Sequence, residues 1–249
     1  MVTVSQEGTG RRSRGTGALL VTAVAMVNGA FVGLSVVFDY PQILQRPAAE
    51  ALRRFTDSGG AVPALFALLA AGAALLAPAA AGTARLVGPG RIARAVTATG
   101  VLAALVQVAG LLRWPLLVPA LARTVTDPHA APDDVADAVE TFQLLHTVLG
   151  QWVGEAAGYV FTSAFTVLLL LGLRRRARLP RVRTAIAVIS VPLILAGLLA
   201  PFGVPGADLA NFAGYILWSV WAAALGVTLL LGRPAADSPD LHEPLIRGA

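Results

Sequence analysis

Six apolar runs, each about twenty residues long, limit the fold of this chain more than any other feature. An α-helix rises ~1.5 Å per residue, so roughly twenty residues cross the ~30 Å hydrocarbon core of a bilayer. Arginines, Pro and Gly clusters or acidic turns bound each run. The runs lie at about 17–38, 61–81, 95–113, 155–173, 184–202 and 211–232. The sequence therefore predicts an all-α integral membrane bundle of six transmembrane helices.

The composition supports a multi-pass membrane protein. Hydrophobic residues make up 56% of the 249 residues and charged residues 13%, whereas a soluble domain has roughly 25% charged residues. The first run follows the sequence RRSR, as a signal peptide would. At about 22 residues it is longer than a signal-peptide core of roughly 7–15, so we expect an uncleaved anchor. The chain has no cysteine, which excludes disulfides and thiolate chemistry.

The arginines predict an orientation in the membrane. All nineteen basic residues are arginine. Fourteen of them lie in the N-terminal tail, the second and fourth connections and the C-terminal tail, and five lie on the other side. Because arginine is enriched in cytoplasmic loops, we expect a cytoplasmic tail at 1–16, a six-span domain at 17–232 and a second cytoplasmic tail at 233–249. The arginines flank apolar runs, so the net charge does not indicate a nucleic-acid partner.

The connections on the less basic side predict short interfacial helices, which would lie on the extracytoplasmic face. In the segment 46–55 the apolar residues share one helical face and the charged residues lie elsewhere, as in a helix that lies on a membrane surface. The segment WPLLVPAL contains Pro115 and Pro119 and is expected to bend along the surface. The segment 132–145 begins with acids that suit a helix N-terminus. Together these segments would roof the outer end of the bundle.

The stretch LLHTVLGQWVGEAAGY, residues 144–159, places ionisable side chains ahead of the fourth apolar run. On an unbroken α-helix His146 and Glu155 lie on opposite faces, because nine positions turn the helix by about 900°. His146 shares its face with a row of glycines that predicts close packing against another helix. Glu155 shares its face with a polar stripe. The glycine row is Gly150, Gly154 and Gly158, and the stripe is Gln151, Tyr159, Thr162 and Thr166.

Counting residues places Arg113 and Glu155 at one depth. They lie eighteen and nineteen residues from the arginine-rich ends of their spans, or roughly 27–28 Å along a helix. One interpretation is a structural ion pair between the third and fourth spans. The other is a carboxylate that faces a cavity, where it binds a ligand or transfers a proton.

An outward-facing polar pocket near Arg113, His146, Gln151 and Glu155 is the predicted site. Glu155 and His146 are the candidate catalytic residues, as general acid or base, although His146 also suits a hydrogen-bonded structural role. The candidate ligand-binding residues are Arg113, Gln151, Tyr159, Asn28, Gln107 and Asn211. For Asn28 and Gln107 the alternative is a hydrogen bond between helices, and Trp114 and Trp152 suit interfacial anchors. His129, His146 and His242 are too scattered for a metal site, and no cofactor is indicated.

Four segments carry a resemblance to a known family. In chain order they are FDYPQILQRPAAEALRRF, LLRWPLLVPALAR, LHTVLGQWVGEAAGY and NFAGYILWSVW. Their order resembles a family of bacterial integral membrane proteins, domain of unknown function 4386, over roughly residues 17–232. The resemblance implies a compact helical bundle in a bacterial cytoplasmic membrane and implies no established activity. In that family a histidine often follows the glutamate, and Ala156 stands at that position here.

Three functional hypotheses follow. The first is the binding or processing of a small lipophilic molecule that enters from the outer leaflet. The second is a small transporter or an export or immunity component, and the third is a non-catalytic accessory or sensory membrane subunit. The expected partners are the lipid bilayer, a small lipophilic ligand and further copies of the chain. The sequence leaves open whether the protein is an enzyme, and it indicates no substrate.

Overall fold

The computed structural model describes residues 3–175 and 180–232, and within these ranges the chain is helical and contains no strand. Six helical stretches are long and apolar enough to cross a membrane, and each overlaps one of the apolar runs. They are Ser13–Phe38, Ala61–Val87, Arg91–Thr126, Pro132–Arg174, Arg181–Phe202 and Ala207–Leu230. The prediction of an all-α bundle of six transmembrane helices is confirmed.

The helical stretches are longer than the apolar runs, because several consist of consecutive elements. α3 and α4 form one stretch, as do α5 and α6, and α7, η2 and α8 form a third. The elements are α1 (Thr3–Phe38), η1 (Gln42–Gln45), α2 (Ala48–Asp57), α3 (Ala61–Ala74), α4 (Leu76–Val87), α5 (Arg91–Leu116), α6 (Val118–Thr126), α7 (Pro132–Leu145), the π-helix η2 (His146–Ala157), α8 (Gly158–Arg174), α9 (Arg181–Ala196), η3 (Gly197–Phe202) and α10 (Ala207–Leu230). The predicted C-terminal tail and His242 lie outside the described residues.

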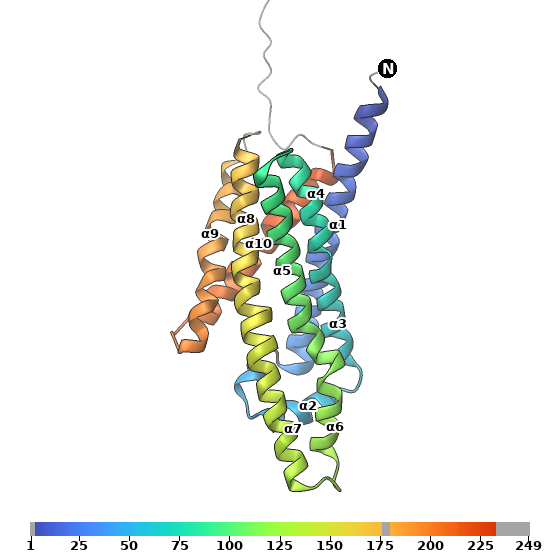
Figure 1. Cartoon of the computed structure of the whole chain (residues 1–249), viewed down its shortest axis with the longest axis vertical. Coiled ribbons are helices and arrows are strands. Elements are labelled where there is room, and N and C mark those ends of the chain that lie inside the picture. Colours follow the sequence, from blue (N-terminus) through green and yellow to red (C-terminus); the bar gives the residue numbers. More distant parts are fainter. Residues whose placement is uncertain (1–2, 176–179, 233–249) are drawn as a thin grey trace, which may run out of the picture.

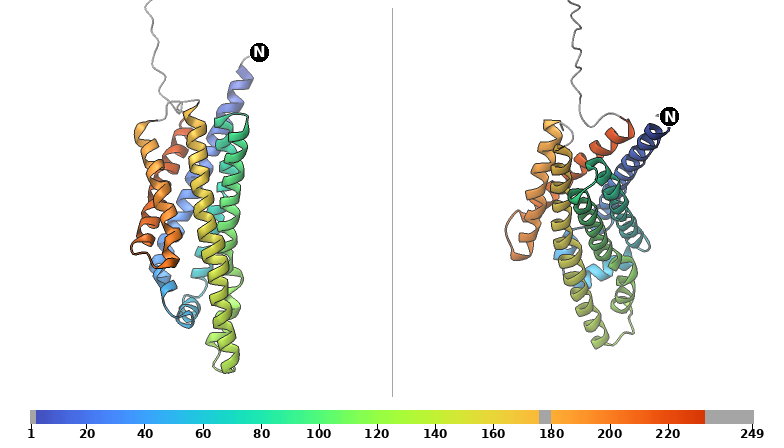
Figure 2. Two further views of the ribbon diagram at one scale, coloured as in Figure 1. Left: turned by 60° about the vertical axis from the view of Figure 1, so that its left-hand side comes forward. Right: turned by 45° about the horizontal axis from the view of Figure 1, so that its top comes forward.

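The six spans lie side by side (Figures 1 and 2), and their contacts close a ring. α1 packs against α3 and α4, these pack against α5, and α5 packs against α8. α8 then contacts α9, α9 packs against α10, and α10 returns to α1. The first and last spans are therefore neighbours. They meet at glycines, because a Cβ added to Gly17 would lie 2.5 Å from the carbonyl oxygen of Gly226.

The two ends of the bundle differ in structure (Figure 1). At one end, which we call the arginine end, α1 begins, α4 turns into α5, and α8 and α10 finish. At the other end, α2, α6 and α7 form a cap that extends beyond the ring (Figure 2). The α4–α5 turn is tight because Gly88 and Gly90 take positive φ values of 79° and 140° around Pro89, a conformation that favours glycine.

The core of the cap is aromatic. Trp114 is 0% exposed and stacks on Phe66, with ring centroids 4.6 Å apart and an interplanar angle of 5°. Phe38, Phe55 and Phe142 also contact the indole. The expectation that Trp114 is an interfacial anchor is therefore wrong, because segments from α1, α2, α3 and α7 enclose it. Trp152 is 56% exposed on the surface of η2.

Two predictions for the cap segments have different outcomes. The amphipathic helix predicted at 46–55 is present as α2, with Ala51, Leu52 and Phe55 buried. The segment with Pro115 and Pro119 is broken as predicted, since α5 ends at Leu116 and α6 begins at Val118. α6 nevertheless continues the helical stretch Arg91–Thr126, and its course along a membrane surface stays a prediction. The amide of Leu117 still donates to the carbonyl of Arg113 at 2.9 Å, and Pro119 lies in the first turn of α6, where no amide donor is needed. α6 pairs with α7 and α2.

Candidate functional site

The crossing of α5 and η2 positions the candidate site. A Cβ added to Gly110 would lie 2.6 Å from the Cα of Gly154, so the two backbones touch. On either side of this contact, Gly150 lies against the guanidinium group of Arg113, and Gly158 lies against the side chain of Gln107. The glycine row predicted to be a close-packing seam is confirmed, and its partner is α5.

The ionisable residues of the fourth span lie on a π-helix. η2 covers His146–Ala157, and its i→i+5 bonding gives roughly 4.4 residues per turn. Nine residues then make close to two turns, whereas they make two and a half turns of an α-helix. The expectation of opposite faces, which holds for an α-helix, does not apply to this segment. π-Helical segments are rare and occur frequently at functional sites.

Arg113 is a buried cation at the end of α5. It is 5% exposed, and its Nη1 donates a hydrogen bond to the carbonyl of Gly110. Its guanidinium carbon lies 5.4 Å from the centroid of the Trp114 ring, within the range of a cation–π interaction. The last turn of a helix favours a cation. These contacts fix the position of the guanidinium group but do not neutralise its charge.

Arg113 and Glu155 do not form a direct ion pair. They interact electrostatically, but none of their nitrogen–oxygen pairs lies within 4.0 Å. In the described ranges the only ion pairs join Arg46 to Asp39 and to Glu50. Glu155 is half-buried and accepts no hydrogen bond from the described residues. The structural ion pair considered from the sequence is therefore not formed.

All three tyrosines of the chain, Tyr40, Tyr159 and Tyr215, lie within electrostatic range of Glu155. The Glu155 carboxylate acts electrostatically on each of their hydroxyl groups, and the rings of Tyr159 and Tyr215 lie 5.8 Å apart. Burial raises the pKa of Tyr40 to about 12, Glu155 adds to this rise, and Arg113 opposes it. Sequence reasoning missed Tyr40 and Tyr215. The only signal in the sequence was position. Tyr40, Tyr159 and Tyr215 all lie at span ends that the arginine distribution predicts to be on the same side of the membrane.

Two further polar atoms near Arg113 are buried without a hydrogen-bond partner in the described part of the chain. They are Nδ1 of His146 and Nε1 of Trp114. The His146 ring stacks on Phe142 with 6.4 Å between centroids, and Arg113 acts electrostatically on it. Buried polar groups in proteins are nearly always hydrogen-bonded, so the unpartnered atoms mark this cluster as unusual.

The polar residues deeper in the ring bond to one another. Asn28 donates to the Val24 carbonyl at 2.8 Å and to Ser219 at 3.2 Å. Gln107 donates to Thr162 at 3.2 Å. The amides of Asn28 and Gln107 therefore join helices, which is the alternative considered for them from the sequence.

The polar stripe below Glu155 is also packed. Thr162 and Thr166 are buried, and the indole of Trp218 donates to Thr166 at 2.9 Å. Asn211 donates to the Ile194 carbonyl at 2.6 Å, so its amide holds the end of α9. Gln151 is half-buried on η2 and makes no hydrogen bond with a described residue. The structure thus places Arg113 within electrostatic range of His146 and Glu155, and Glu155 within range of Tyr159. Asn211 lies beside Tyr159, since both side chains contact Gly197.

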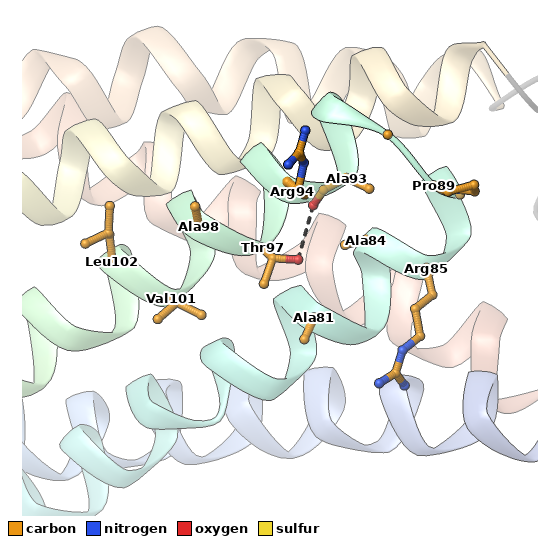
Figure 3. A pocket seen from close by; sticks show the side chains of 12 residues that line it. Ala81, Ala84, Arg85, Pro89, Ala93, Arg94, Thr97, Ala98, Val101 and Leu102 are labelled. Carbon is orange, nitrogen blue, oxygen red and sulfur yellow. Dashed lines mark hydrogen bonds between the residues drawn. The ribbon is translucent and has the colours of Figure 1, made fainter.

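Two grooves open on the surface, and neither is lined by Arg113, His146, Gln151 or Glu155. One, of about 980 Å³, runs between α4 and α5 near the arginine end (Figure 3). The other, of about 680 Å³, lies between α6 and α7 at the tip of the cap. The polar cluster around Glu155 is therefore distinct from both grooves.

Comparison with known proteins identifies a family. A family model described as a domain of unknown function, DUF4386, matches residues 15–231. The match includes all six spans and the cap. No curated protein and no solved structure matches the chain.

Proposed function

The chain belongs to the DUF4386 family, and on that premise we propose that it binds a small lipophilic molecule whose single polar group lies beside Glu155. The supporting observation is the unpaired charge cluster at the crossing of α5 and η2. The molecule's apolar body would lie among the apolar side chains of the surrounding spans. The arginine distribution supports placing the cap outside and both termini in the cytoplasm, so that the ligand enters from the outer leaflet.

Unpaired charges support a ligand because they are costly in this environment. A carboxylate or guanidinium group taken from water costs several kcal/mol unless it is paired and hydrogen-bonded. Arg113 and Glu155 lie close enough to interact but do not touch. A polar group between them can accept a hydrogen bond from the guanidinium group and donate one to the carboxylate. Such a ligand supplies what neither side chain obtains from the protein.

The surrounding side chains support a neutral or zwitterionic ligand group. The hydroxyls of Tyr40 and Tyr159 can donate to or accept from one polar group, whereas that of Tyr215 hydrogen-bonds to Thr162. None of the three carries a charge at neutral pH. Within this proposal Glu155 is the hydrogen-bond acceptor, and with a reactive ligand it is the general acid or base. Nδ1 of His146, which has no protein partner, is a second contact beneath the cap.

The deeper part of the ring supports binding over transport. A translocation path through the ring needs polar groups that face water or a substrate. Here Asn28, Gln107 and Thr166 hydrogen-bond to neighbouring helices. These bonds close the interior below Glu155. We therefore prefer a ligand site near one membrane surface to a path across the bilayer.

Native mass spectrometry of the purified protein tests the proposal. The Glu155→Gln variant keeps the size of the side chain and removes its charge. Because a hydrogen bond to a charged group contributes about 1.5–3 kcal/mol, we expect ligand retention to fall roughly ten- to hundred-fold. The matched control is Glu140→Gln, since Glu140 is exposed on α7. The melting temperature of both variants should stay near that of the parent protein. Unchanged retention in Glu155→Gln would contradict the proposed role.

A further inference from the structure

The groove between α4 and α5 has an apolar floor of small side chains. Ala84, Ala98, Val101 and Leu102 line it. The Thr97 hydroxyl donates to the Ala93 carbonyl at 3.1 Å, so it offers no free donor to the groove (Figure 3). The helices can approach closely because Gly100 packs directly against Ala80 and Phe165. The result is a smooth apolar channel on the outside of the ring.

Arginines flank the mouth of this groove. Arg85 extends from α4 and Arg94 from α5, and their guanidinium groups point away from one another, to the two sides of the groove (Figure 3). Both are exposed, and neither belongs to the ion pairs of the described residues, which both use Arg46. Neither α4 nor α5 contains an acidic residue. The two arginines therefore have no carboxylate on their own helices to neutralise them.

The length of the groove matches one leaflet of a membrane. Its lining on α5 runs from the α4–α5 turn to Leu102, which is the twelfth residue of that helix. Twelve helical residues span ~18 Å, slightly more than half of the ~30 Å hydrocarbon core. A channel of this length is deep enough for one lipid tail, and its charged mouth lies at the end where a head group would be.

We propose that the groove between α4 and α5 binds an anionic phospholipid, with its phosphate at the basic mouth, where the exposed side chains of Arg85 and Arg94 can turn toward it, and one acyl chain against Ala98, Val101 and Leu102. Charge complementarity selects this occupant. The acyl chain of a neutral lipid could pack on the apolar floor, but its head group would gain little electrostatic attraction from the arginines. Basic pockets between transmembrane helices bind anionic head groups in this way. The site lies at the arginine end and does not depend on a ligand at Glu155.

Lipid retention measured by native mass spectrometry tests the charged mouth. The full chain is exchanged into micelles containing equal amounts of phosphatidylglycerol and phosphatidylcholine. We expect the parent to retain phosphatidylglycerol preferentially. The Arg85→Gln change should lower that retention about five-fold, and Arg85→Gln with Arg94→Gln about 25-fold, since each cation near an anionic surface contributes similarly. The matched control replaces Arg53 and Arg54, which are exposed on α2 in the cap, with Gln and should retain the lipid like the parent.

The outcomes separate a built site from general attraction. An equal loss in the α2 control means that total charge attracts the lipid, and it overturns the proposal. Unchanged retention in the double variant of Arg85 and Arg94 overturns it as well. The Ala98→Phe variant keeps Arg85 and Arg94 but fills the apolar floor of the groove. It should therefore also lower the retention of phosphatidylglycerol, at an unchanged melting temperature. Retention equal to that of the parent in Ala98→Phe contradicts the assignment of the acyl chain.

Crosslinking identifies what lies in the groove. The chain has no cysteine, so Ala98→Cys can be labelled at one position with a benzophenone maleimide. After irradiation in bilayers that contain phosphatidylglycerol, we expect a lipid adduct. Capture of residues 233–249 of the same chain, or of a second copy, would show a peptide or protein in the groove and would overturn the proposal.

Discussion

The close contact between α5 and η2 predicts a large effect of a single methyl group. In Gly110→Ala the new Cβ would lie 2.6 Å from the Cα of Gly154 and 2.8 Å from the carbonyl oxygen of Leu149. Ordinary contacts begin at 3.4 Å, so the two helices would have to separate by about 0.8 Å. Overpacking costs about 1–3 kcal/mol, and the upper value applies because both obstacles are backbone atoms. Alanine regains up to ~1 kcal/mol of helix propensity, so we expect a net loss of about 2 kcal/mol.

A graded series of glycine variants provides the controls. Gly158→Ala meets the flexible side chain of Gln107 at 3.1 Å, so its loss should be smaller. Gly29→Ala has no heavy atom within 4 Å and should be neutral or stabilising by up to ~1 kcal/mol. The free energy of unfolding of the three variants is measured in the same detergent. If Gly110→Ala is as stable as Gly29→Ala, the backbones do not touch at this crossing and the reasoning is refuted.

Three further predictions use other parts of the structure. For topology, an impermeant maleimide should label Ala131→Cys in intact cells and Pro89→Cys only after lysis, and the reverse pattern would invert the proposed orientation. In the cap, Trp114→Ala should cost about 3–5 kcal/mol in thermal unfolding, whereas Trp152→Ala, at an exposed position, should change stability by less than ~0.5 kcal/mol. For pH, the pKa of Tyr40 is about 12 when folded and roughly 10 when unfolded, so the unfolded state ionises first as the pH rises. Stability should then fall by up to ~2.7 kcal/mol between about pH 10 and 12, and a Tyr40→Phe variant that falls equally would exclude Tyr40 as the cause.

Much of the fold could be predicted from the sequence because lipid imposes simple rules. A helix that crosses hydrocarbon needs an uninterrupted apolar run, so the six spans follow from hydropathy. The buried face of α2 follows from the spacing of Ala51, Leu52 and Phe55. The glycine row of the fourth span predicts a close approach of helices, and the structure confirms it with Gly110 as the partner.

The arrangement of the site could not be predicted in the same way. Helical-wheel reasoning assumes 3.6 residues per turn, and η2 departs from it over the segment that contains His146 and Glu155. Tyr40 follows the first span by two residues, and only the tertiary fold brings it toward Arg113 and Glu155. Trp114 is buried because four distant segments meet around it, which no local pattern encodes. Matching depth placed Arg113 near Glu155 but could not show whether the two side chains touch.

The ring of spans also sets an order for assembly during synthesis. α1 is the first span made, and α10, the last, is one of its neighbours. Until α10 is inserted, the face of α1 that includes Gly17 is open to lipid, and Asn28 has no Ser219 to bind. A nascent chain can complete the cap earlier, because its aromatic core ends at Phe142. The ribosome must therefore deliver the last span before the bundle can close, and in any product truncated before residue 207 the Asn28 amide keeps only its bond to the Val24 carbonyl and faces the bilayer without its interhelical partner.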